Sequence, residues 1–247
     1  MLGPYMRCLR ANLKGATGFT LLGMAPNLRP TVQEGPMTVI LCCGDSNTHG
    51  TPPMQAQGEY RRFDADTRWP RLLARALAAE VVEEGLPGRT AQFPDPVMGA
   101  IMDGREGLKA ALQSHGPIDW LVIMLGTNDV KARFGASPEL ITGGIAALLD
   151  IAQSPEMQAR HGGFRILLIC PPPVLEQGPI GDQFYGARRR SLKLPPLYKA
   201  LADARRISFM DAGRVISVSD QDGVHFEAAT HGVLAKSVAN ALSTDMA

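Results

Sequence analysis

The chain has 247 residues, and 45% of them are apolar, which is enough to bury a folded core. Its 25 basic and 24 acidic residues give a net charge of +1, so nothing in the charge favours nucleic acid or an anionic membrane as a partner. No apolar stretch approaches the ~20 residues that cross a bilayer.

The first 36 residues differ from the rest, with scattered Gly and Pro and no sustained periodicity. Arg7, Arg10 and Lys14 precede an apolar stretch that glycine interrupts, and no clean cleavage site follows. We therefore expect an N-terminal extension or flexible arm over 1–36 rather than a secretory signal. A single domain is expected over 37–247.

The four cysteines form neither a zinc spacing nor a CxxC pair. They are Cys8, Cys42, Cys43 and Cys170. This usage is typical of reduced thiols in a cytoplasmic protein. No cluster has metal-ligand spacing, so neither a metal nor another cofactor is expected.

Along the chain, apolar runs predict strands at 38–43, 80–83, 120–125, 165–170 and 207–210. Helical patterns lie between or after them, at 68–79, 104–115, 138–153, 196–204 and 227–242. The central runs are apolar at consecutive positions, which suits strands covered on both faces. This alternation predicts an α/β sandwich around a parallel sheet.

The longest stretch without a predicted element is 171–195. A loop of this length in a compact domain is usually functional or an interface. Its basic run at 188–190 is interpreted as a solvated or subunit-contact patch, because the whole chain is nearly neutral.

In a parallel sheet, ligands bind beyond the carboxyl ends of the strands. Polar and glycine residues follow four of the predicted strands: Gly44, Asp45, Ser46 and Asn47; Gly85, Gly88 and Thr90; Gly126, Thr127, Asn128 and Asp129; and Asp220, Asp222 and His225. A hydroxyl, a histidine, a carboxylate and amide or backbone donors are what acyl transfer requires.

Each of these residues has a structural explanation when taken alone. Ser46 could cap a helix, and Asp222 could cap the last one. Asn128 and Asp129 could form turns, and His225 could be an ordinary core or surface histidine. Their joint occurrence, each after a successive strand, favours a functional site.

The blocks "GDSN", "GTND" and "DGVH", in this order, resemble the SGNH (GDSL-type) hydrolase superfamily, and "LPGRT" is similar to its second block. The resemblance covers about 38–243. "EEGLPGRT", "MLGTNDVK" and "FMDAGRVISVSDQDGVHF" are most similar to its arylesterase, acyltransferase and carbohydrate acetylesterase branch. The resemblance to this superfamily implies a flavodoxin-like, three-layer α/β/α sandwich of about five strands.

The resemblance also implies roles for individual residues. Ser46 is the nucleophile, His225 the general base and then acid, and Asp222 the residue that orients the imidazole. The backbone N–H groups of Ser46 and Gly88 and the side chain of Asn128 form the oxyanion hole. Supporting or substrate-binding roles are expected for Asp45, Asn47, Thr127, Asp129, Phe184, Tyr185 and Val224.

The resulting hypothesis is a carboxylic ester hydrolase that acts on short acyl chains through an acyl-enzyme on Ser46, with transfer to water or another alcohol. The absence of a G-x-S-x-G elbow argues against an α/β-hydrolase proper. A thioesterase or lysophospholipase for longer chains is the alternative. A non-catalytic anion- or nucleotide-binding module lacks the expected G-x-G-x-x-G.

The expected partners are a small-molecule ester substrate and further copies of the chain. The segment 171–195 is predicted as a loop, yet it contains apolar residues. Surface loops seldom expose such residues unless they contact a ligand or another subunit. We expect it to wall the acyl pocket and to contact another subunit, in a dimer or larger homo-oligomer.

Overall fold

The computed structural model describes residues 37–246, so the predicted extension at 1–36 and Cys8 lie outside the described residues. Five parallel strands form one sheet in the order β2-β1-β3-β4-β5. They are β1 (Val39–Gly44), β2 (Glu80–Gly85), β3 (Trp120–Met124), β4 (Arg165–Cys170) and β5 (Ser208–Asp211). Every strand expected from the sequence is confirmed, with shifts of one or two residues at the ends.

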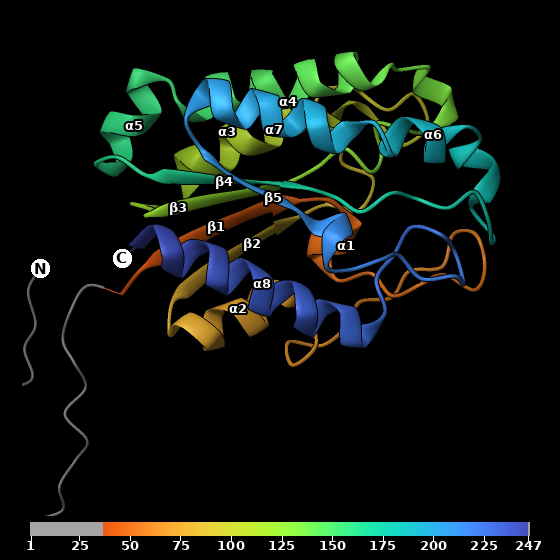
Figure 1. The fold of residues 1–247 in the computed structure, drawn as a ribbon, viewed down its shortest axis with the longest axis horizontal. Coiled ribbons are helices and arrows are strands. Elements are labelled where there is room, and N and C mark those ends of the chain that lie inside the picture. Colours follow the sequence, from red (N-terminus) through yellow and green to blue (C-terminus); the bar gives the residue numbers. More distant parts are fainter. Residues whose placement is uncertain (1–36, 247) are drawn as a thin grey trace, which may run out of the picture. The chain divides into compact units, whose positions relative to one another are not determined.

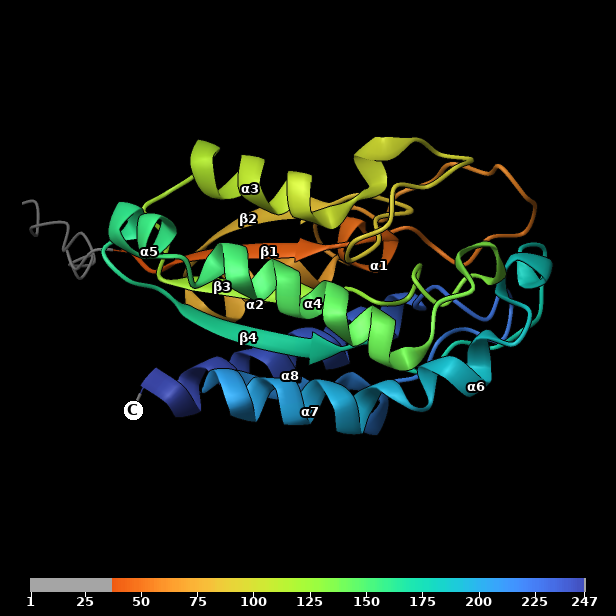
Figure 2. The ribbon, with the colours of Figure 1, turned by 90° about the horizontal axis from the view of Figure 1, so that it is seen from above.

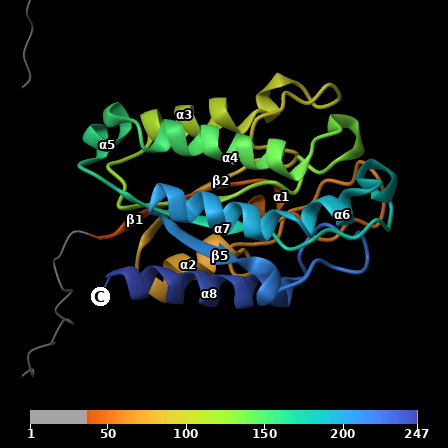
Figure 3. The same cartoon turned by 45° about the horizontal axis from the view of Figure 1, so that its top comes forward.

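Helices cover both faces of this sheet, which confirms the three-layer α/β/α architecture (Figures 1 and 3). One layer contains α3 (Gly104–Ser114), α4 (Pro138–Ala152), α5 (Pro155–His161) and α7 (Leu194–Arg205). The other contains α2 (Trp69–Leu77) and α8 (Ala228–Met246). Among these described helices, none combines the length and apolar character needed to span a bilayer.

The two cores explain why the central strands are apolar at consecutive positions. Leu41 and Cys43 of β1 pack in the cluster beneath α3, α4 and α7, whereas Ile40 and Cys42 pack in the cluster beneath α2 and α8. Successive side chains of a strand point to opposite faces, so both faces need apolar residues when both are covered. Cys42, Cys43 and Cys170 are buried free thiols.

One helix that the periodicity did not predict is the seven-residue α5. Its start resembles that of α4: a serine accepts a hydrogen bond from the backbone three residues later, and a proline follows it. Ser154 Oγ lies 3.3 Å from the backbone N of Met157, as Ser137 Oγ lies 3.2 Å from that of Leu140. Serine caps the helix and proline suits its first turn, where no N–H partner is needed.

Short elements gather at the carboxyl ends of the strands, where α1 and α6 are seen in Figures 1 and 2. They are α1 (Ser46–His49), η1 (Ala100–Met102), η2 (Ala132–Phe134), η3 (Gly181–Phe184), α6 (Ala187–Ser191) and η4 (Ala212–Arg214). The segment 171–195 is therefore not irregular throughout, because it contains η3, α6 and the start of α7.

The basic run at 188–190 is only partly solvated. Arg188 and Arg189 are exposed, but the Arg190 guanidinium donates hydrogen bonds to the carbonyl oxygens of Val130 and Tyr185, at 2.7 and 2.8 Å. Arg190 thereby fastens the segment 171–195 to the loop that follows β3.

Candidate active site

Ser46 lies in the sharp turn between β1 and α1. The residue that caps α1 is Asp45, whose Oδ1 accepts a hydrogen bond from the backbone N of Asn47 at 2.9 Å. Ser46 is the first residue of the helix, so the interpretation of Ser46 as the helix cap is wrong. The turn also needs Gly44, because a Cβ there would lie 2.1 Å from Thr48 Oγ1. The Ser46 hydroxyl is therefore left free for another partner.

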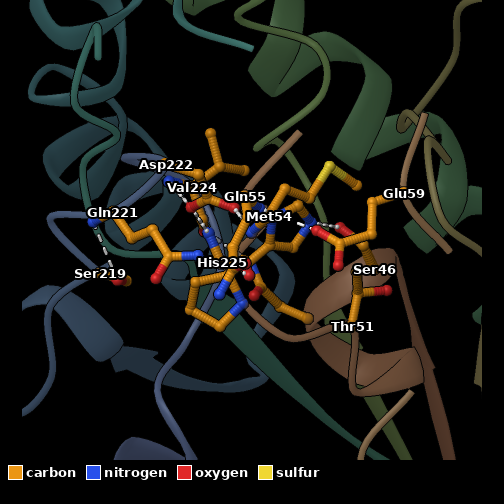
Figure 4. A network of polar contacts seen from close by, with 12 residues as sticks. Ser46, Thr51, Met54, Gln55, Glu59, Ser219, Gln221, Asp222, Val224 and His225 are labelled. Carbon is orange, nitrogen blue, oxygen red and sulfur yellow. Dashed lines mark hydrogen bonds and ion pairs between the residues drawn. The ribbon is translucent and has the colours of Figure 1, made fainter. Parts of the chain in front are cut away.

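That partner is His225, which lies 179 residues later in the chain. Ser46 Oγ lies 3.0 Å from His225 Nε2, and His225 Nδ1 lies 2.6 Å from Asp222 Oδ2 (Figure 4). All three residues are buried. This chain of contacts joins a hydroxyl, an imidazole and a carboxylate in the order that a serine nucleophile, its base and an orienting acid require.

The Asp222 carboxylate is held from several sides. Its Oδ1 accepts the backbone N–H groups of Val224 and His225 at 3.0 and 2.9 Å, and its Oδ2 accepts that of Met54 at 2.7 Å. Burial alone would raise the pKa of Asp222. The hydrogen bonds from His225 and Met54 together lower it by more, so the pKa lies below its usual value. Asp222 does not cap the last helix, which begins at Ala228.

Asn47 connects the serine turn to the histidine loop. Its Nδ2 donates to the carbonyl oxygen of Val224 at 3.1 Å. Because Val224 directly precedes His225, this bond fixes the position of the imidazole relative to Ser46. The expected supporting roles of Asn47 and Val224 are consistent with these contacts.

Three donors border the space in front of Ser46. Within residues 37–246, the backbone N–H groups of Ser46 and Gly88 have no hydrogen-bond acceptor. Asn128 Nδ2 is bound to the carbonyl oxygen of Arg89 at 3.0 Å, and its other contact, to Asp45 Oδ2, is long at 3.4 Å. Two unused N–H groups and one loosely held amide hydrogen are thus available for an anionic oxygen.

Gly88 has a backbone conformation that a residue with a side chain rarely adopts. Its φ is +93°, and a Cβ would lie 2.5 Å from the end of the Met98 side chain. The glycine therefore allows the turn that carries its N–H and leaves room for Met98.

A set of buried polar residues supports the donors from below. Both carboxylate oxygens of Asp129 accept the backbone N–H of Ala91, at 2.9 and 3.0 Å, and burial raises the pKa of Asp129 to about 7. Burial also raises the pKa of Asp45, against the opposing effect of hydrogen bonds from Asn47 and Thr127. These contacts join the loop after β3 to the loops after β1 and β2.

The triad and the donors meet at a cavity of about 490 Å³. Of the residues that the sequence singled out, Ser46, Gly88, Asn128, Phe184, Val224 and His225 line it, whereas Asp45, Asn47, Thr127 and Asp129 are buried behind it. Tyr185 is not among the lining residues and is 77% exposed, so its expected supporting or substrate-binding role stays a prediction. The contact of the segment 171–195 with another subunit stays a prediction.

Several lining residues were given no individual role by the sequence. They are Met54, Gln57, Gly58, Pro87, Val97, Met98, Lys131, Arg133, Ile180 and Gln183. Met54 comes from a loop without periodicity. Pro87 and Lys131 lie within the blocks "LPGRT" and "MLGTNDVK", and Ile180 and Gln183 lie in the segment 171–195 that was expected to wall the pocket. In the described part of the chain, no group of three or more His, Cys, Asp or Glu side chains is arranged to hold a metal ion.

Residues 42–233 match the model of the GDSL-like lipase/acylhydrolase family. No curated protein matches the chain. Among solved structures, the chain is similar to an aryl esterase from M. smegmatis, with 34% identity, a TM-score of 0.79 and coverage of 84% of this chain and 99% of that one. A carbohydrate acetylesterase from Sinorhizobium meliloti is 33% identical, with the same TM-score and coverage.

A further structure, of a carbohydrate acetylesterase family member from Sinorhizobium meliloti, is 31% identical, has a TM-score of 0.78 and covers 84% of this chain and 98% of its own. The family match spans most of the described residues and includes Ser46 and His225. The chain therefore belongs to the GDSL-like lipase/acylhydrolase family of hydrolases.

Proposed function

We propose that the protein is a serine esterase that hydrolyses short-chain, acetyl-type carboxylic esters through an acyl-enzyme on Ser46. The observation that carries this proposal is the continuous contact from Ser46 Oγ through the His225 ring to Asp222 at the wall of a cavity. A surface serine or a structural histidine does not require this series of three contacting side chains.

In the proposed reaction, His225 Nε2 takes the proton of Ser46 as Oγ bonds to the ester carbonyl carbon. The tetrahedral intermediate collapses, the bond to the leaving oxygen breaks, and the alcohol departs with the proton from His225. Water, or another alcohol, then attacks the acyl group by the reverse sequence and restores the Ser46 hydroxyl. Asp222 keeps the imidazole in the required tautomer and stabilises its positive form.

The three donors are assigned to the oxyanion of the tetrahedral intermediate. Preorganised donors at such a position stabilise charge that develops only in the transition state. Asn128→Ala is therefore expected to lower kcat by about 10²- to 10³-fold with little change in KM. Initial rates with 4-nitrophenyl acetate measure this. A kcat within threefold of the wild type, in a variant of unchanged melting temperature, would contradict the role of Asn128.

Short acyl chains are favoured by the walls of the cavity. Phe184 is 1% exposed and Ile180 is 8% exposed, so this side of the cavity is backed by the core. The two similar structures described as an aryl esterase and a carbohydrate acetylesterase support the same substrate class. Transfer to alcohols is the expected side reaction when an apolar pocket limits access of water.

Turnover of 4-nitrophenyl acetate compared with 4-nitrophenyl palmitate tests this proposal. We expect the acetate to be hydrolysed with the higher kcat/KM. A preference for palmitate would favour the thioesterase or lysophospholipase alternative, and the absence of turnover with either ester would favour a binding module. Product analysis in the presence of a primary alcohol measures the share of acyl transfer.

A further inference from the structure

Lys131 places an ammonium group at the catalytic cavity without a partner. The residue lies three positions after Asn128, lines the cavity and is only 6% exposed. Within residues 37–246, its Nζ has no hydrogen-bond acceptor and no carboxylate within ion-pair distance. The Nζ atom instead makes a cation–π contact with the Phe184 ring, whose centroid lies 5.7 Å away. A nearly buried charge that is left unpaired is unfavourable unless a ligand supplies the acceptor.

The other charged residue of the cavity is already paired. Arg133 Nη2 lies 3.2 Å from Asp95 Oδ2 and 3.2 Å from Gln183 Oε1. The lining residues include Lys131 and Arg133 but no aspartate or glutamate. The cavity therefore presents positive charge to its substrate, and Lys131 is the cation that remains available.

The loop that carries Lys131 is held in place on both sides of the residue. The backbone N of Lys131 donates to the carbonyl oxygen of Asn128 at 3.1 Å, and Arg190 binds the carbonyl oxygen of Val130 at 2.7 Å. The helix turn η2 begins at the next residue, Ala132. Because the loop is anchored, little backbone freedom is lost when a ligand binds to the ammonium group.

We infer that Lys131 binds a carboxylate on the substrate, so that the preferred substrates are short-chain esters that also carry an acid group. This inference rests on the proposed esterase function of the same cavity. The carboxylate is carried either by the alcohol part of the ester or by the acyl part, and both present the same chemistry to the ammonium group. Lys131 then acts as a specificity-determining residue, separate from the triad.

The test compares esters that differ in this one charge. For the alcohol side, 3-acetoxybenzoate is compared with neutral 3-acetoxybenzamide; for the acyl side, the phenyl monoester of adipic acid is compared with phenyl hexanoate. In the wild type we expect the anionic member of at least one pair to have the higher kcat/KM by about tenfold or more, as for a charge-assisted hydrogen bond. Lys131→Met, which keeps an unbranched apolar stem, should remove this preference.

Two further variants control the result. Lys131→Arg keeps the charge and should retain part of the preference, whereas Lys236→Met removes an exposed lysine of α8 and should leave the ratio of anionic to neutral kcat/KM unchanged. A wild-type ratio of one or less in both pairs would overturn the inference. A preference that survives in Lys131→Met would overturn it as well.

Calorimetric binding of 3-hydroxybenzoate and 3-hydroxybenzamide separates this inference from the proposed function, because binding needs no turnover. Tighter binding of the acid, lost in Lys131→Met, supports the carboxylate site even if no ester is hydrolysed; the esterase proposal alone would then fail. Hydrolysis that depends on Ser46 but shows no Lys131-dependent preference leaves the esterase proposal standing and rejects the carboxylate site.

The pH dependence gives a second readout. Burial lowers the pKa of Lys131 to about 8, and the nearby Arg133 lowers it too, while Asp95, Asp45 and Asp129 oppose the shift. The ammonium form is present below this pKa and is lost as the pH rises through it. The preference for the anionic ester should therefore be full near pH 7 and decline between about pH 7 and 9; a constant ratio over this range would contradict a role for the Lys131 charge.

Discussion

Replacing Ser46 with alanine is expected to lower kcat for 4-nitrophenyl acetate by at least about 10⁴-fold. The variant lacks the oxygen that would form the acyl-enzyme, so only substrate binding and the oxyanion donors remain. The fold should be preserved, because the one hydrogen bond of the Ser46 side chain within residues 37–246 is with His225. Initial rates measured together with the melting temperature check both parts of this expectation.

Ser217→Ala is a matched control for this experiment, since Ser217 is an exposed serine outside the cavity. It should retain wild-type rates. If Ser46→Ala instead keeps a rate within tenfold of the wild type while folded, Ser46 is not the nucleophile. A trapped acyl group on Ser46, detected by mass spectrometry after rapid quenching, would give direct support.

Replacing Asp222 with asparagine is expected to lower kcat by about 10⁴-fold, although the side chain keeps its size. The carboxylate accepts the Nδ1–H of His225 and backbone N–H groups from Met54, Val224 and His225. An amide has only one oxygen for these donors. Its NH₂ group, turned toward His225, would favour the tautomer with the proton on Nε2, which cannot accept the proton of Ser46.

A control variant, the separate effects on kcat and KM, and the melting temperature distinguish this role from a structural one. Asp220→Asn changes an exposed acid two residues earlier and should leave kcat unchanged. Asp222→Asn should still bind 4-nitrophenyl acetate, so we expect a large fall in kcat and a smaller change in KM. A loss of activity that follows a matching loss of melting temperature would point to unfolding and contradict a role in orienting the imidazole.

The proposed catalytic triad was predictable from the sequence because each member lies in a short local block after a strand. "GDSN" and "DGVH" carry Ser46, Asp222 and His225, and the apolar runs before them identify the strands. The carboxyl ends of parallel strands lie at one edge of a sheet, so these blocks could be expected to meet. The 3.0 Å contact between Ser46 and His225 agrees with that expectation.

Other features were missed for identifiable reasons. The helix α5 is too short for a periodic pattern to stand out, and only its Ser154-Pro155 start indicates it. The sequence did not distinguish Phe184 from Tyr185, although the two side chains point in different directions: Phe184 is buried at the cavity and Tyr185 is exposed. Met54 binds Asp222 through its backbone N–H, so the residue type at this position does not indicate the contact.

By itself, the sequence determined the alternation of strands and helices, the family and the residues that carry the proposed chemistry. These depend on local patterns: side-chain polarity along a strand or helix, and short blocks at its end. Only the tertiary structure decided that Asp45 rather than Ser46 caps α1, that the N–H groups of Ser46 and Gly88 are free, and that Lys131 is buried without a partner. Burial and partner choice are set by residues far apart in the chain, so packing must be known before an unpaired charge can be recognised.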